Sequence, residues 1–251
     1  MHAPRLSAPP LFAGHNIHLD LGGRSILSDI SLQVEKGEVL GIIGPNGAGK
    51  TSLFEVLSGR LQPKAGRVSF NGRDITSLPL HQRARLGIGR TFQTPIVPEG
   101  LTVAEVFKAT RQAYRPYLTP DDSEWGAGLV DFRVSSNLIA EQLDTLHRRK
   151  LLLACLLMRR PALLLMDEPA AGLINSEIDE LDEIMRVLAK ELDIAIIIVE
   201  HRIELLETIA DRAMVMDAGE TVSEGSLADV LADPKVHAAY FEFVADDEAE
   251  A

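Results

Sequence analysis

VLGIIGPNGAGKTSLFEVLS, residues 39–58, is the stretch that decides the fold of this chain. It opens with the apolar run Val39–Ile43, whose length and composition are typical of a strand buried on both faces. Gly44–Thr51 follows with the GxxxxGK(S/T) spacing of a phosphate-binding loop, and residues 51–58 continue as a helical segment. Since strand, loop and helix come in the order that this motif requires, the sequence predicts a nucleotide-binding P-loop rather than an ordinary glycine-rich turn.

Each residue type in the loop suits the binding of a triphosphate. Glycines let backbone N–H groups converge on the anionic phosphates, and the N-terminus of the following helix adds its positive dipole. We expect Lys50 to reach the β and γ phosphates and the Thr51 hydroxyl to bind Mg²⁺. The predicted ATP-binding residues are Gly44, Pro45, Asn46, Gly47, Ala48, Gly49, Lys50, Thr51 and Ser52.

A second apolar run, Leu163–Met166, ends in the two acidic residues Asp167 and Glu168. A carboxylate at the end of a buried strand can hold Mg²⁺ through water, which predicts that role for Asp167. Glu168 is then predicted to polarise the attacking water. Alone, such an acidic pair usually marks only a strand end that meets solvent, but downstream of a P-loop it indicates a hydrolytic site.

The fold class follows from alternating strands and helices. Val39–Ile43, Leu163–Met166 and Ile194–Val199 have the character of strands in a parallel sheet, and helical patterns separate them. The clearest helix is expected to follow Ser176 as its N-cap, with Asp179 three residues on. Its apolar residues recur at three- and four-residue spacing: Ile178, Leu181, Ile184, Met185 and Leu188. We therefore predict an α/β P-loop NTPase core with a mostly parallel sheet.

Two further parts are expected around this core. A hairpin over Ile17–Val34 and a strand over Arg67–Phe70, which ends at an Asn-Gly turn, indicate an antiparallel β appendage. From Thr102, which has a capping-box pattern with Glu105, to Arg160 the pattern is helical, interrupted by proline and glycine. We expect an inserted helical subdomain over about 96–160, and a strand-turn-strand over 213–224 followed by short helices.

The expected domain organisation is a single ATPase domain over residues 11–251. Residues 1–10 are expected to be an N-terminal extension, and residues 245–251 an acidic tail. A chain of this length fits one large α/β domain with an insertion better than two independent domains.

Composition limits the possible partners and compartments. Lys and Arg number 25 against 37 Asp and Glu, and the formal net charge of -12 has the wrong sign for nucleic-acid binding. Cys155 is the single cysteine, so an intramolecular disulfide is impossible and a reducing compartment fits. The sequence shows no secretory signal and no apolar run near the ~18 residues of a membrane helix. Any membrane role is therefore expected to go through partner proteins.

The motifs resemble those of ABC-transporter ATPase subunits, most closely the branched-chain amino acid type. GIGRTFQTP at 87–95, DEPAAGL at 167–173 and VEH at 199–201 match that group in order and spacing, and the resemblance runs from Ile17 to Phe241. It implies ATP hydrolysis coupled to transmembrane transport, with ATP and Mg²⁺ as cofactors. It also implies that Gln93 links the Mg²⁺ site to the helical subdomain and ligates the metal, and that His201 contacts the γ-phosphate. Without these motifs, each would be interpreted as an ordinary polar residue.

The chain departs from the family at the ABC signature, where the family has Leu-Ser-Gly-Gly-Gln or a close variant. Counting back from Pro161 without gaps, only Leu143 survives, and the positions that follow are Asp144, Thr145, Leu146 and His147. In the family this segment completes the ATP site of the partner subunit. Here a negative charge and added Cβ atoms would face the triphosphate, so we expect the site formed by this segment to be weak.

Two smaller departures accompany the degenerate signature. Leu21 stands where an adenine-stacking aromatic residue is usual, so we expect only an apolar contact with the base. Ile174 replaces the usual Asp or Asn of the D-loop.

The resemblance implies a dimer in which each ATP site joins the P-loop of one subunit to the signature of the other. We therefore expect a heterodimer with a second ABC ATPase subunit whose signature is intact, giving one competent and one weakened site. The other implied partners are integral membrane permease subunits and a possible solute-binding protein acting with the permease, at the cytoplasmic face of the inner membrane. The predicted function is import of amino acids or related small polar solutes.

Two alternatives were weighed against the importer. The first is a soluble or lipid-export ABC ATPase of an assembly complex, which would share the same motifs. The second, a P-loop kinase, would account for Lys50 and Asp167 but not for Gln93, Glu168 and His201 in this order.

Overall fold

The computed structural model describes residues 9–236, so the acidic tail and residues 1–8 of the expected extension lie outside the described residues.

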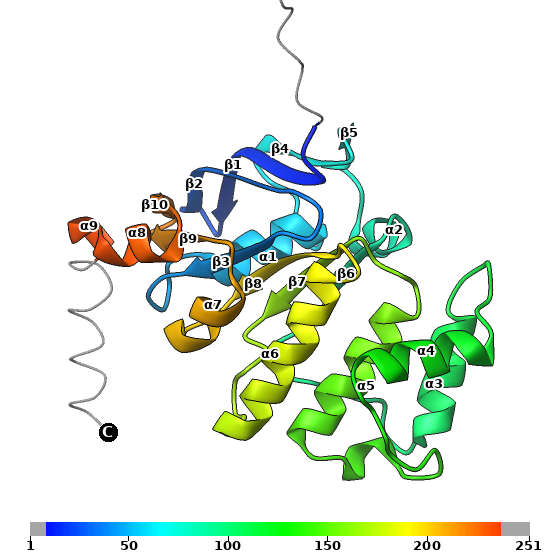
Figure 1. Cartoon of the computed structure of the whole chain (residues 1–251). Coiled ribbons are helices and arrows are strands. Elements are labelled where there is room, and N and C mark those ends of the chain that lie inside the picture. The colour runs from blue at the N-terminus through cyan, green and yellow to red at the C-terminus, as the bar shows by residue number, and fades with distance from the viewer. Residues whose placement is uncertain (1–8, 237–251) are drawn as a thin grey trace, which may run out of the picture.

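The central sheet holds most of the buried strands. The sheet has the order β10-β9-β3-β8-β7-β6 (Figure 1). Its strands are β3 (Val39–Ile43), β6 (Ile88–Arg90), β7 (Leu163–Asp167), β8 (Ala195–Val199), β9 (Arg212–Asp217) and β10 (Glu220–Gly225). All neighbours pair in parallel except β9 and β10, which confirms the predicted α/β fold with a mostly parallel sheet.

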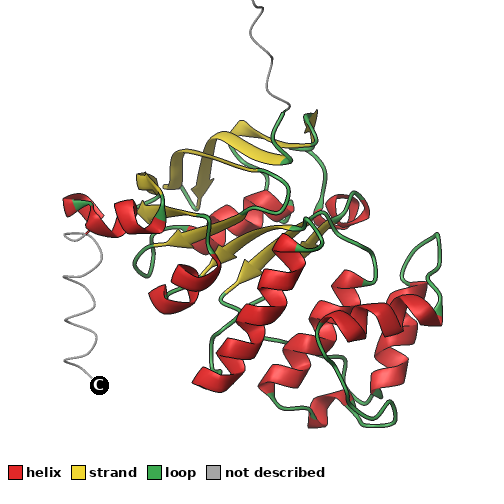
Figure 2. Cartoon of the chain, in the orientation of Figure 1, coloured by secondary structure: helices red, strands yellow, loops and turns green. Residues whose placement is uncertain are grey.

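Burial on both faces explains why β3, β7 and β8 appear as continuous apolar runs. Every residue of these strands is buried. Alternate side chains enter different cores: Leu40 and Ile42 pack towards α1 (Lys50–Ser58), whereas Val39 and Ile43 pack towards α6 (Asn175–Lys190) and α7 (Ile203–Ile209). Figures 1 and 2 show α1 between the two sheets and α6 and α7 on the opposite face.

The second sheet is the predicted antiparallel appendage. It has the order β2-β1-β4-β5, formed by β1 (Phe12–Leu21), β2 (Arg24–Val34), β4 (Ala65–Phe70) and β5 (Arg73–Asp74). Gly22 and Gly23, with φ of 57° and 80°, close the first hairpin. Asn71 and Gly72, with φ of 50° and 73°, close the second one, as the Asn-Gly pair predicts.

The start of α6 differs from the prediction. The helix begins at Asn175 and its N-cap is Ile174, not Ser176. The carboxylate of Glu177, rather than Asp179, accepts a hydrogen bond from the Ile174 N–H at 2.9 Å, so the first turn is already formed at Ser176. The predicted apolar stripe of this helix is buried against the central sheet.

The helical region of residues 103–157 lies beside α6, away from the antiparallel sheet (Figure 1). It contains α3 (Val103–Gln112), α4 (Pro120–Leu129), the 3-10 turn η1 (Ala140–Gln142) and α5 (Thr145–Leu157). The predicted capping box is present at α3, where Thr102 N–H donates to Glu105 Oε2 at 2.8 Å and Glu105 N–H to Thr102 Oγ1 at 3.3 Å. The remaining helices are α2 (Leu80–Arg85), α8 (Leu227–Ala232) and α9 (Pro234–Val236), and the last two follow the predicted strand-turn-strand.

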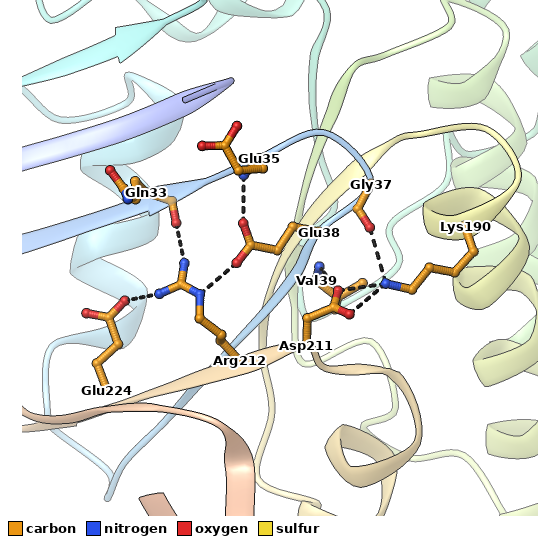
Figure 3. Close-up of polar contacts among 9 residues, drawn as sticks. All are labelled: Gln33, Glu35, Gly37, Glu38, Val39, Lys190, Asp211, Arg212 and Glu224. Atoms are coloured by element: carbon orange, nitrogen blue, oxygen red, sulfur yellow. Dashed lines mark hydrogen bonds and ion pairs between the residues drawn. The ribbon is translucent and has the colours of Figure 1, made fainter. Parts of the chain in front are cut away.

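A network of hydrogen bonds and ion pairs links the segments of the chain at the start of β3 and β9 (Figure 3). Arg212 donates to Glu38 Oε1 and to Gln33 O, both at 2.7 Å, and it also pairs with Glu224. Burial alone would lower the pKa of Arg212, but the hydrogen bonds and charges of Glu38 and Glu224 raise it. Beside it, Asp211 accepts the Val39 N–H at 2.8 Å and pairs with Lys190 of α6 at 2.7 Å.

We expect Arg212→Met to lower the free energy of unfolding by about 1–3 kcal/mol, because it leaves the mostly buried Glu38 carboxylate without its charged partner. Denaturant unfolding measures this change. Arg67→Met is the matched control, since Arg67 and Asp74 form an exposed pair 3.0 Å apart whose loss should cost less than about 0.5 kcal/mol. Equal destabilisation by the two variants would contradict the role given to this network.

Candidate functional site

Glycine is sterically required at both ends of the loop between β3 and α1. A Cβ atom at Gly44 would lie 2.1 Å from the Met216 carbonyl oxygen, and one at Gly49 would lie 2.9 Å from a Leu27 methyl group. Gly47 is different, because its φ is 84° and no heavy atom lies within 4 Å of its Cβ position. The loop is therefore packed on one side and open on the other, as a cradle for an anion must be.

Lys50 begins α1 and directs its ammonium group into this loop. The residue is 6% exposed, and its Nζ donates to Gly44 O at 2.6 Å and to Pro45 O at 2.9 Å. Burial lowers the pKa of Lys50, while the carboxylates of Glu168 and Asp167 act in the opposite direction. Since an ammonium has three donors and two are used here, the geometry fits a lysine with a proton left for phosphate.

The three predicted catalytic side chains meet at Glu168. Gln93 Nε2 donates to Glu168 Oε2 at 2.6 Å, and His201 Nε2 lies 3.1 Å from Glu168 Oε1. Each of the three follows the carboxyl end of its strand, β6, β7 or β8, and these strands are neighbours in the parallel sheet. Carboxyl ends of parallel strands share one edge, which is where such sheets bind ligands.

Glu168 also has an unusual backbone conformation. Its φ is 45°, in the left-handed region that non-glycine residues rarely occupy. Such strain typically costs about 1–3 kcal/mol and persists only where the surroundings hold it in place. The Glu168 N–H donates to Val199 O at 2.9 Å, which links the strained residue to the end of β8.

Asp167 is the last residue of β7, and a buried arginine holds it from behind. Arg90 Nη2 lies 3.7 Å from Asp167 Oδ2, and Arg90 also bonds Glu55 Oε1 at 2.7 Å and Ser58 Oγ at 2.5 Å. Burial raises the pKa of Asp167, and the Arg90 guanidinium opposes that shift. Arg90 thus ties α1 to β7. Sequence reasoning missed this role, although a charged residue between Gly89 and Thr91 in an otherwise strand-like segment was a visible signal.

The oxygen donors at this edge suit Mg²⁺. Thr51, Asp167 and Gln93 offer a hydroxyl, a carboxylate and an amide oxygen, which are hard ligands. Within residues 9–236, no group of three or more His, Cys, Asp or Glu side chains is arranged to hold a metal ion. One carboxylate with few other protein ligands is the arrangement by which Mg²⁺ binds together with nucleotide phosphates.

At the segment predicted to stand in the place of the signature, an aspartate caps the N-terminus of α5. Asp144 is the N-cap of α5, and its Oδ1 accepts the His147 N–H at 2.8 Å. His147 Nδ1 lies 2.8 Å from both oxygens of the same carboxylate. Burial of Asp144 would raise its pKa, but the hydrogen bonds from His147 lower it overall, so its negative charge is favoured. Leu146 is buried beneath this turn and Thr145 is exposed.

The two smaller departures are both exposed apolar side chains. Leu21 lies at the end of β1, 41% exposed, and Ile174 lies just before α6, 67% exposed.

The comparison with known families agrees with this geometry. Residues 27–171 match the family described as ABC transporter. The chain belongs to this family. A probable ABC transporter ATP-binding protein of Azorhizobium caulinodans is 32% identical over 95% of this chain and 85% of the relative. The branched-chain amino acid transport ATP-binding protein BraF of Pseudomonas aeruginosa is 30% identical over 92% of this chain and 97% of the relative.

Other similar proteins extend the range of transport systems. The lipopolysaccharide export ATP-binding protein LptB of Acidithiobacillus ferridurans is 31% identical over 86% of this chain and 90% of the relative. The crystal structure of an ATP-binding cassette of an ABC transporter in its ADP conformation superposes with a TM-score of 0.82 at 28% identity, covering 92% of this chain and 98% of that chain. This ABC protein is therefore a transporter ATP-binding subunit and an ATPase that works with membrane permease subunits.

No helix in the described part of this subunit is long and apolar enough to cross a membrane.

Proposed function

We propose that this subunit hydrolyses ATP with Glu168 as the residue that accepts a proton from the attacking water. The observation that supports the proposal is the convergence of Gln93 and His201 on the Glu168 carboxylate. Each carboxylate oxygen has one neighbour that orients it and keeps a second lone pair for water. A general base held in this way needs little reorganisation before it acts.

The other residues of the site bind and orient. Lys50 binds the β and γ phosphates, Leu21 makes an apolar contact with the base, and His201 contacts the γ-phosphate. When bound, Mg²⁺ supplies positive charge against the phosphates, and Thr51, Asp167 and Gln93 are the residues of this chain that would hold it. The position of Asp167 supports this role, because its buried carboxylate at the end of β7 is stabilised by a nearby cation.

We further propose that the active assembly is a heterodimer with one competent and one weakened ATP site. The support lies at the start of α5, where the His147 N–H already bonds the Asp144 carboxylate. A helix N-terminus binds anions through its free N–H groups and dipole. Here a negative side chain occupies that position, so a phosphate of the partner's ATP would meet repulsion. The partner must therefore bring an intact signature to complete the site of Lys50, Asp167, Glu168 and His201.

For the transport system, we propose import of amino acids or related small polar solutes, with a permease and a possible solute-binding protein. The similarity to BraF supports this function. Lipid export remains a second candidate because LptB is equally similar. A groove of about 410 Å³ beside Gln93, next to the exposed Phe92 and Ile96, offers the subunit an apolar surface for a membrane partner.

Glu168→Gln should lower the rate of ATP hydrolysis roughly 100- to 10,000-fold while nucleotide binding persists, since the amide cannot accept the proton. Phosphate release and binding of a fluorescent ATP analogue measure the two effects separately. Glu183→Gln, on the exposed face of α6, is the control. Unchanged hydrolysis in Glu168→Gln would refute the assigned role.

The purified chain alone should hydrolyse ATP slowly, and addition of the partner subunit should raise the rate. The double variant Asp144→Ser, Thr145→Gly should raise the rate of the chain alone by about tenfold or more, because it removes the repulsion and the exposed Thr145 side chain at the start of α5. Hydrolysis at full rate by the unmodified homodimer would contradict the heterodimer.

The tagged chain should be recovered from membranes together with integral membrane proteins. Mass spectrometry of the copurified proteins identifies the permease, and stimulation of the ATPase by a solute-loaded binding protein supports import. Stimulation by lipid would instead favour export. A complex that contains only soluble proteins would overturn both transport assignments of this chain.

A further inference from the structure

The strained turn of residues 168–171 is held from the side of the helical region by Arg149. This residue lies near the start of α5, and its Nη1 donates to Glu168 O at 3.2 Å. Its Nη2 donates to Ala171 O at 2.6 Å. Because the Ala171 N–H itself donates to Glu168 O at 3.1 Å, one guanidinium spans both ends of the turn. A planar fork suits two such carbonyls, whereas a lysine could bind only as a point charge.

Glu200 bonds the same turn from the end of β8. It follows β8, is 3% exposed, and accepts the Ala170 N–H on Oε1 at 2.8 Å. Its Oε2 accepts the His201 N–H at 3.2 Å. The side chain therefore joins the turn that contains Glu168 to the backbone of the histidine that touches the Glu168 carboxylate.

The charge of Glu200 also acts on Arg149. Burial lowers the pKa of Arg149, and the carboxylates of Glu200 and Glu168 oppose that shift. Arg149 Nε is buried and has no hydrogen-bond partner within residues 9–236, so the two Nη groups make its described hydrogen bonds, both to this turn. A desolvated cation held in this way has few alternative positions.

We propose that Arg149 is a positioning residue for Glu168: it holds the turn in which Glu168 adopts φ of 45°, with Glu200 as its counterpart across that turn. This inference rests on the proposed role of Glu168 as general base. It has a consequence for regulation, because α5 begins at the Asp144 segment. Any displacement of that segment by the partner's nucleotide moves Arg149 and, through it, the Glu168 of the same chain.

The test compares Arg149→Met and Arg149→Lys in the full chain, alone and in the complex recovered from membranes. We expect kcat to fall roughly ten- to hundredfold in the methionine variant, since small misplacements of a catalytic group have effects of that size. KM and the affinity for a fluorescent ATP analogue should change less than about twofold, because Arg149 is bonded to the 168–171 turn and not to the P-loop. The lysine variant should show a smaller loss of kcat.

Lys150→Met is the matched control. Lys150 is the next residue of α5 and is more buried than Arg149, but its ammonium pairs with Glu180 of α6 rather than with the 168–171 turn. It should lower the melting temperature without lowering kcat. The double variant Glu168→Gln, Arg149→Met should be no slower than Glu168→Gln alone, because a residue that acts through Glu168 has nothing left to position.

The outcomes separate this inference from the proposed function. If Glu168→Gln abolishes hydrolysis and Arg149→Met leaves kcat unchanged, the positioning role is wrong and the general base stands. If Arg149→Met lowers kcat and nucleotide affinity together, as a general loss of structure would, the positioning role is also wrong. If Glu168→Gln hydrolyses ATP at the normal rate, the proposed function itself fails.

Discussion

The parallel pairing of β3, β7 and β8 is the constraint on which the rest of this structure depends. The pairing registers place the end of β3 beside the end of β8, and the end of β8 beside that of β7. Residues that are far apart in the chain, such as Gln93 and Glu168, can then meet without any long reach of side chains. The candidate site for ATP hydrolysis is therefore assembled by the strand order of the sheet, which brings several motifs together at one edge.

Buried cations stabilise the fold of a chain with a net charge of -12. Arg83 is the extreme case, since it is fully buried and donates to the carbonyls of Leu78, Val56, Leu57 and Thr76. Burial lowers its pKa to about 10. Two of these carbonyls belong to the last turn of α1, where a cation is favoured by the helix dipole. The helix thus has a cation at its C-terminal end and the open loop at its N-terminal end.

The sequence predicted the features that depend on local order and missed those that depend on charged contacts between distant segments. The P-loop could be predicted because its strand, glycines and lysine are contiguous in the sequence. The strands of the central sheet could be predicted because burial of both faces makes them continuous apolar runs. β6 was not predicted, since three residues that include Gly89 give no periodicity. Arg149 and Glu200 could not be found, because their partners are backbone atoms brought near only by the fold. Ser176 is not the N-cap because the helix already begins at Asn175, and the Glu177 carboxylate bonds the N–H of the N-cap residue Ile174.

The two ends of the central sheet are built differently, and this difference has a mechanical consequence. At the amino ends of β3 and β9, Arg212, Asp211 and Lys190 link β2, β3, β9, β10 and α6 with short polar and charged contacts (Figure 3). At the carboxyl ends, loops and a strained turn take their place. The two ends therefore differ in how they can open: the amino ends are joined by charged contacts between strands, whereas the carboxyl ends carry the loops that contain Gln93, Glu168 and His201. We expect backbone amide hydrogen exchange to be slowest near the Arg212 network and faster in those loops.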